Sequence, residues 1–173
     1  MLLSPNFSPA RDATLHGLRS LVSRGRHAEA ERLAQSQRRR LNAAEGSAFL
    51  ALRAEISLGL GRFTAALEWA SEALKSLAAG DRLTRVLEIS RVRALIGLGR
   101  FREAHVALEG RLMVLDPGGL EPKLLRAQVA LHSGRLDDAT RSAADACESA
   151  VSIRDRAMLV EALLVRARAA RER

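Results

Sequence analysis

The chain repeats one six-residue pattern four times: GRHAEA (residues 25–30), GRFTAA (61–66), GRFREA (99–104) and GRLDDA (134–139). The glycines that open these segments are 36, 38 and 35 residues apart. Apolar residues recur at helical spacing around each segment, without strand-like alternation. A period of this length is typical of a helical solenoid, in which each unit buries its apolar face against its neighbours. The sequence therefore predicts an all-α fold, a right-handed α-solenoid of about four helical hairpins plus a C-terminal helix.

Each repeated segment is interpreted as the turn of one hairpin. Its glycine falls where a helix must end and the chain reverse, which favours the left-handed backbone conformation that glycine adopts easily; these hinge glycines are Gly25, Gly61, Gly99 and Gly134. The residue two positions later is predicted to plug its own hairpin, and is His27, Phe63, Phe101 or Leu136. The residue five positions after the glycine is predicted to let the two helices approach closely, and is Ala30, Ala66, Ala104 or Ala139.

The predicted hairpins cover residues 11–40, 44–78, 81–115 and 120–151, and a ninth helix covers about 153–171. Residues 1–10 are predicted to be a mobile N-terminal arm, and residues 11–173 the helical repeat domain. The ninth helix carries two apolar faces, one with Ile153, Ala157, Val160, Leu163 and Leu164 and another with Met158 and Val165. Three interpretations stay open: a cap, self-association through this helix, or a longer array.

These features resemble the tetratricopeptide repeat family, whose unit has about 34 residues. The second unit matches its small residue midway along the first helix, its aromatic residue after the turn glycine and its two later alanines, with Ala54, Phe63, Ala66 and Ala73. The resemblance runs from about residue 12 to the C-terminus. The chain departs from the family pattern in lacking tyrosine and in having longer repeats. The resemblance implies a fold and does not identify a ligand.

In the resembled family, the first helices of the hairpins line a concave groove. Carried over to this chain, the resemblance implies a polar ladder of Arg19, Glu55, Arg93 and Gln128. It implies aliphatic groove residues Leu15, Leu52, Ile89 and Leu124. The same positions also include Asp12, His16, Val22, Leu58, Ser90, Ile96, Glu121, Leu125 and Leu131. For Val22, Leu58, Ile96 and Leu131, packing between repeats is the alternative. The family's Lys and Asn carboxylate clamp is missing, so an amphipathic helix is the favoured ligand.

Sequence motifs for catalysis, phosphate binding or metal binding are missing. The chain has no GxxxxGK[ST], GxGxxG, HExxH, GxSxG or CxxC segment, its four histidines lie at no ligand spacing, and Cys147 is its single cysteine. We therefore expect no enzymatic activity, no cofactor and no metal.

Composition bears on partners and location. The net charge is +8, but the basic residues are 26 Arg and 2 Lys interleaved with 20 acids, which favours a GC-rich bacterial genome over phosphate binding. The one basic cluster, residues 38–40, is predicted at a helix C-terminus, where cations are favourable; a functional basic patch is the alternative. Only 3% of the residues are aromatic, too few for RNA stacking. Without an apolar run of about 18 residues, we expect a cytoplasmic protein with no membrane insertion and no nucleic-acid partner.

The sequence therefore predicts a non-enzymatic protein–protein interaction module, a scaffold whose groove binds an apolar, helical segment of a protein or peptide. One alternative is the regulatory or sensor arm of a larger bacterial signalling protein or transcription regulator. Another is a secretion-type chaperone that holds apolar segments.

Overall fold

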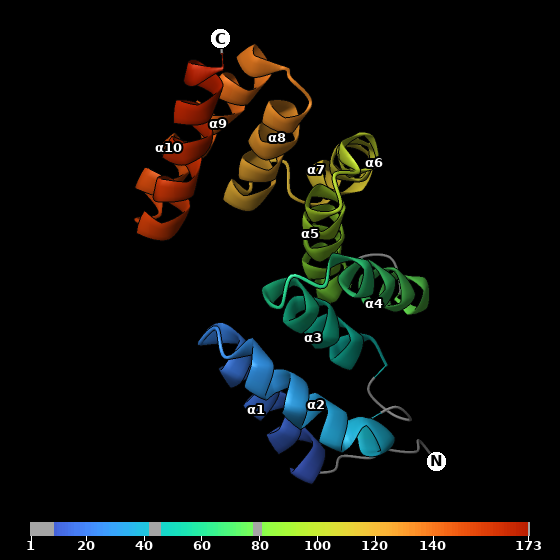
Figure 1. Cartoon of the computed structure of the whole chain (residues 1–173). Coiled ribbons are helices and arrows are strands. Elements are labelled where there is room, and N and C mark those ends of the chain that lie inside the picture. The colour runs from blue at the N-terminus through green and yellow to red at the C-terminus, as the bar shows by residue number, and fades with distance from the viewer. Residues whose placement is uncertain (1–8, 42–45, 78–80, 173) are drawn as a thin grey trace, which may run out of the picture.

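The computed structural model describes residues 9–41, 46–77 and 81–172, which contain helices and turns but no strand. Four hairpins follow one another along the chain (Figure 1). Hairpin 1 consists of α1 (Pro9–Ser23) and α2 (His27–Leu41), and hairpin 2 of α3 (Gly46–Gly59) and α4 (Phe63–Ser76). Hairpin 3 consists of α5 (Arg82–Gly97), α6 (Phe101–Ala107), the π-helical segment η1 (Leu108–Leu112) and α7 (Met113–Leu115), hairpin 4 of α8 (Leu120–His132) and α9 (Leu136–Ser152), and α10 (Arg156–Arg171) comes last. The all-α prediction is confirmed.

Successive hairpins pack on one another in a repeated arrangement. The first helix of each hairpin contacts both helices of the preceding one: α3 contacts α1 and α2, α5 contacts α3 and α4, and α8 contacts α5 and α6. Helix α10 contacts α8 and α9 in the same way, so it takes the position of a first helix. Figure 1 shows the hairpins in chain order from α1–α2 at one end to α9–α10 at the other.

The four turns share one backbone geometry. All four hinge glycines are left-handed, with φ between +69° and +72°. At the first, the Gly25 N–H donates to the Val22 carbonyl and the Arg26 N–H to the Leu21 carbonyl, both at 2.9 Å, which is the Schellman pattern that closes a helix C-terminus. A Cβ built on these glycines would meet nothing within 4 Å, so the backbone conformation, and not space, selects glycine. The predicted turns are confirmed.

The arginine after each hinge glycine forms an ion pair. Arg26 contacts Glu29 at 2.5 Å and Arg100 contacts Glu103 at 2.6 Å, each three residues on. The fourth hairpin has the same pair, between Arg135 and Asp138 at 3.7 Å. Hairpin 2 has alanine at that position, and Arg62 instead contacts Glu31 of hairpin 1 at 3.7 Å.

Small residues lie at the contacts inside each hairpin. The hinge alanines Ala30, Ala66, Ala104 and Ala139 are all 0% exposed, in agreement with the predicted close approach. The midway residues of the first helices are equally buried, and are Leu18, Ala54, Val92 and Ala127. A larger side chain at either position has no free space to enter, which fixes the register of the two helices.

The residue two after the hinge glycine contacts the next hairpin, so the prediction that it plugs its own hairpin is wrong for three of the four. A Cβ added to Gly59 would overlap the His27 ring, and one added to Gly97 would come within 2.5 Å of the Phe63 ring. In the third case Phe101 stacks on His132, with ring centroids 5.0 Å apart. The contacted residues Gly59, Gly97 and His132 each lie two residues before the next hinge glycine. We call the first two contacts the glycine joints and the third the ring joint.

Hairpin 3 departs from the repeat in its second helix. The π-helical segment begins at Leu108, a fully buried residue where the other hairpins have alanine. From this segment Arg111 reaches the buried carboxylate of Glu88 on α5 at 3.0 Å, and Glu109 forms a bidentate pair with Arg126 on α8 at 2.6 and 2.8 Å. The segment therefore links α5 to the hairpin that follows.

Two predictions about the chain ends change. Helix α1 already includes Pro9 and Ala10, and the remaining residues of the predicted N-terminal arm, 1–8, lie outside the described residues. At the other end, Val165 is buried and Met158 packs against the same cluster, so this face contacts α8 and α9. Of the two predicted apolar faces of this helix, the one with Met158 and Val165 therefore packs inside the fold. The exposed apolar face consists of Val160, Leu163 and Leu164.

Candidate functional site

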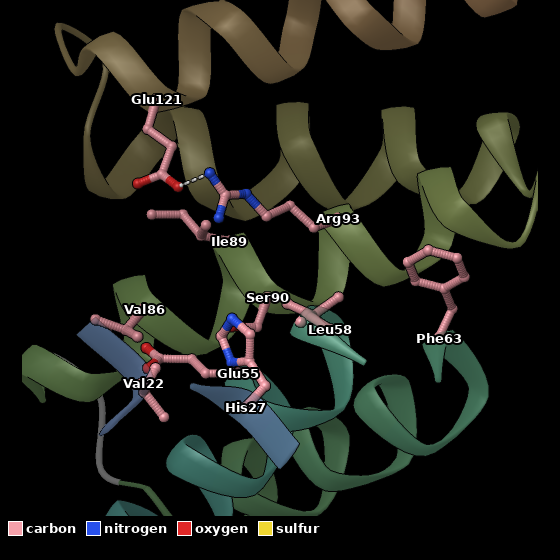
Figure 2. A pocket seen from close by; sticks show the side chains of 11 residues that line it. Val22, His27, Glu55, Leu58, Phe63, Val86, Ile89, Ser90, Arg93 and Glu121 are labelled. Carbon is pink, nitrogen blue, oxygen red and sulfur yellow. Dashed lines mark ion pairs between the residues drawn. The ribbon is translucent and has the colours of Figure 1, made fainter. Parts of the chain in front are cut away.

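A groove of about 580 Å³ lies over the first three hairpins and the start of the fourth (Figure 2). The first helices contribute most of its lining, and His27 and Phe63 come from the first residues of α2 and α4. The lining residues are Val22, His27, Glu55, Leu58, Gly59, Phe63, Val86, Ile89, Ser90, Arg93 and Glu121.

Seven of these eleven residues were among the predicted groove positions: Val22, Glu55, Leu58, Ile89, Ser90, Arg93 and Glu121. The other four, His27, Gly59, Phe63 and Val86, were not. Three of them belong to the glycine joints, whose sequence signal is a glycine near the end of a helix. Glycine costs about 1 kcal/mol relative to alanine inside a helix, and close approach of another group is a common reason for it.

The predicted aliphatic row is mostly core. Leu15 and Leu52 are buried together in one cluster between hairpins 1 and 2, and Leu124 is buried in the cluster beneath α10. These three residues are buried and none of them lines the groove, so their assignment as groove contacts is wrong. Ile89 is also 93% buried, at 7% exposure, but its side chain borders the groove.

Two of the four members of the predicted polar ladder, Glu55 and Arg93, line the groove, and Arg19 lies close enough to act on Glu55 electrostatically. Arg19, Glu55 and Arg93 lie on α1, α3 and α5, and both arginines act electrostatically on Glu55. Gln128 is half-buried on α8 and does not line this groove. Instead Glu121, at the start of α8, forms an ion pair with Arg93 at 2.7 Å. Figure 2 shows this ion pair at the edge of the groove.

Glu55 is the carboxylate inside the groove. Burial raises its pKa, the positive charges of Arg93 and Arg19 oppose that rise, and the negative charge of Glu121 adds to it. Within the described part of the chain, its carboxylate has no ion pair or hydrogen bond. Arg93 is committed to Glu121, which leaves Glu55 with distant cations only.

The groove around Glu55 is apolar. Val22, Leu58, Phe63 and Val86 supply hydrocarbon surface from four different helices, and Figure 2 shows the Glu55 carboxylate between Val22 and Val86. The Nδ1 atom of His27 is buried and has no hydrogen-bond partner among the described residues. An occupant of this groove would therefore meet aliphatic walls and a small number of unmatched polar atoms, the arrangement typical of binding sites.

Among residues 9–41, 46–77 and 81–172, no three His, Cys, Asp or Glu side chains lie close enough together to hold a metal ion. No helix in these ranges is both long and apolar enough to cross a membrane. The side chains of residues 38–40, the predicted basic cluster, lie outside the described residues.

None of the family models, curated proteins or solved structures compared with the chain matches it. The function must therefore be argued from the groove itself.

Proposed function

We propose that this chain is a non-enzymatic protein-interaction module, a tetratricopeptide-like right-handed α-solenoid whose groove binds an apolar, helical segment of a partner protein. The observation that carries the proposal is the groove of about 580 Å³, lined by three successive first helices and walled by aliphatic and aromatic side chains.

The side chains available in the groove support a helical ligand. An α-helix presents apolar residues at positions i, i+3, i+4 and i+7 along one face, and such a face anchors in apolar grooves. Val22, Leu58 and Val86 come from three neighbouring first helices, so a ligand that crosses these helices can contact each in turn. Leu58 and Val86 are half-buried and belong to none of the buried clusters, so they are free to contact a partner.

The proposal is tested with a pair of matched variants. Val86→Glu places a charge in the groove, whereas Val106→Glu makes the same change at a residue that is 70% exposed on α6, outside the groove. Proteins captured from a lysate of the source cells by the wild type are identified and quantified by mass spectrometry. We expect Val86→Glu to lose a specific protein that Val106→Glu retains, with unchanged helicity in both.

Salt distinguishes this surface from a nucleic-acid site. Burial of aliphatic groups is insensitive to salt or strengthened by it, whereas release of counterions from phosphates weakens binding by orders of magnitude between about 50 and 200 mM. We expect a shallow salt dependence for the captured protein. Equal capture by both variants, or a steep loss with salt, would contradict the proposal.

A further inference from the structure

Glu55 is the groove residue whose charge the rest of the groove leaves unmatched. Glu55, Arg93 and Glu121 line the cavity from three successive first helices, and Arg19 on α1 acts on Glu55 electrostatically. Arg93 and Glu121 already neutralise each other at 2.7 Å. Arg19 is exposed and contributes the weakest of the electrostatic effects on Glu55, so it does not replace a direct partner.

An unpaired carboxylate in such a place lowers the stability of the fold. Removing a charged group from water costs free energy unless a counter-charge or hydrogen bonds replace the water. The pKa of Glu55 is raised because burial, together with the negative charge of Glu121, outweighs the attraction of the two arginines. Perturbed carboxylates in clefts are candidates for ligand binding, because a ligand can supply the missing partner.

We propose that Glu55 pairs with a lysine or arginine side chain of the helical segment bound in the groove, and so selects partners that carry a basic residue within their apolar face. This inference rests on the proposed function. It adds the chemistry that distinguishes one apolar helix from another.

The surroundings of Glu55 fit a long basic side chain in particular. Lysine and arginine carry hydrocarbon stems that pack on apolar surface while the charged head reaches a polar group. Val22, Val86 and Leu58 supply that apolar surface next to the carboxylate. The His27 ring lines the same cavity, while its Nδ1 atom is buried against Gly59.

The test is a selection from a displayed library of random helical 16-residue peptides on the full chain. The same library is selected on the wild type, on Glu55→Gln, and on Glu161→Gln, an exposed α10 glutamate outside the groove that serves as the charge-matched control. A fourth selection on Val86→Glu identifies peptides that use the groove. Circular dichroism verifies that each variant is folded.

On the wild type and on Glu161→Gln, we expect peptides with an apolar stripe interrupted by one lysine or arginine at a constant place. On Glu55→Gln this basic preference should disappear. For a synthesised wild-type peptide, replacing its basic residue by norleucine should weaken binding roughly 10-fold or more, the scale of a charged hydrogen bond. On Glu55→Gln the same replacement should have little effect.

The contradicting outcomes separate the two proposals. Groove-dependent peptides with an apolar stripe but no basic preference, or with an acidic one directed at Arg19, overturn the role of Glu55 and leave the proposed function supported. Peptides whose enrichment is unaffected by Val86→Glu bind elsewhere and overturn the proposed function itself.

Discussion

The glycine joints and the ring joint occupy the same position in the repeat and produce different surfaces. At the glycine joints, His27 and Phe63 lie on the backbone of Gly59 and Gly97, and His27, Gly59 and Phe63 line the groove. At the ring joint, Phe101 meets the His132 side chain, and neither residue lines the groove. The joints that end on a glycine therefore border the groove, and the joint that ends on a histidine does not.

The ion pairs differ between these regions as well. Hairpins 3 and 4 are linked by Arg93–Glu121 at 2.7 Å and by the bidentate Arg126–Glu109 pair. Among the described residues no ion pair links hairpin 2 to hairpin 3.

Hairpins 1 and 2 are joined by a ring-on-glycine contact and by ion pairs of Glu31 with Arg53 and Arg62. Hairpins 2 and 3 are joined by a ring-on-glycine contact, and hairpins 3 and 4 by stacking and charge. The unpaired Glu55 lies in hairpin 2, on the side of the ring-on-glycine contacts.

The largest expected effect tests what the two regions have in common. Ala66→Leu in hairpin 2 and Ala139→Leu in hairpin 4 each overpack a fully buried contact, and we expect a loss of about 2–3 kcal/mol in unfolding free energy from either. Urea denaturation measures both. If one variant is as stable as the wild type, the hairpins do not share the same packing register and the comparison of joints loses its basis.

The next effect tests a glycine joint directly. Gly97→Ala places a Cβ 2.5 Å from the Phe63 ring, which must shift, and we expect a loss of about 1–3 kcal/mol. Gly17→Ala on α1 is the matched control, because its Cβ would make only an ordinary 3.7 Å contact with Leu33 of α2. The control should be neutral or up to about 1 kcal/mol more stable, from helix propensity. Equal unfolding midpoints for the two variants would rule out the ring-on-glycine contact.

A smaller effect is expected at the ring joint. His132→Ala removes the stack with Phe101, and because His132 is exposed we expect a loss of about 0.5–1 kcal/mol. His16→Ala, an exposed histidine on α1, is the control. Hydrogen exchange should show the loosening in hairpins 3 and 4 and not in hairpin 1; a uniform change along the chain would contradict a local stack.

The smallest effect concerns Glu55 and depends on pH. Its pKa is raised in the folded protein above the usual value of 4.5 because the side chain is buried, so the folded state holds this proton more tightly than the unfolded state. As the pH rises through the raised pKa of Glu55, the folded protein loses the stability that protonated Glu55 contributes. At neutral pH the carboxylate is charged, and its unfavourable effect on the unfolding free energy is fully present. We expect Glu55→Gln to melt at a higher temperature than the wild type at pH 7, with the difference shrinking towards pH 4. A lower melting temperature of Glu55→Gln at pH 7 would show that Glu55 is paired, and a difference independent of pH would show that its charge is not the cause.

The sequence predicted the hairpins well because the residues that form each turn are close together in the chain. The left-handed turn at each hinge glycine and the small residues around it act within about ten residues, so the period reveals them. The ladder of Arg19, Glu55 and Arg93 could be predicted in the same way, because each member lies at the same sequence distance before its own hinge glycine.

The remainder depends on contacts between hairpins, which the period does not show. Leu15 and Leu52 face the neighbouring hairpin and not the groove, because each first helix packs on both helices of the preceding hairpin. His27 and Phe63 were assigned to their own hairpins because the glycines they contact, Gly59 and Gly97, lie more than thirty residues away in the sequence. The exposed face of α10 follows likewise from which side contacts α8 and α9, and self-association through it stays a prediction.

The most direct test of the central claim, that the groove over the glycine joints receives the partner, is site-specific photo-crosslinking. A diazirine analogue of leucine replaces Leu58 in the groove or Gln128, the ladder position on α8 beyond it. After irradiation in the source cells, the adducts are sequenced by mass spectrometry. We predict adducts from position 58 that map to an apolar helical segment with a basic residue, and none from position 128. Adducts from position 128 alone would place the binding surface on hairpin 4 and contradict this account.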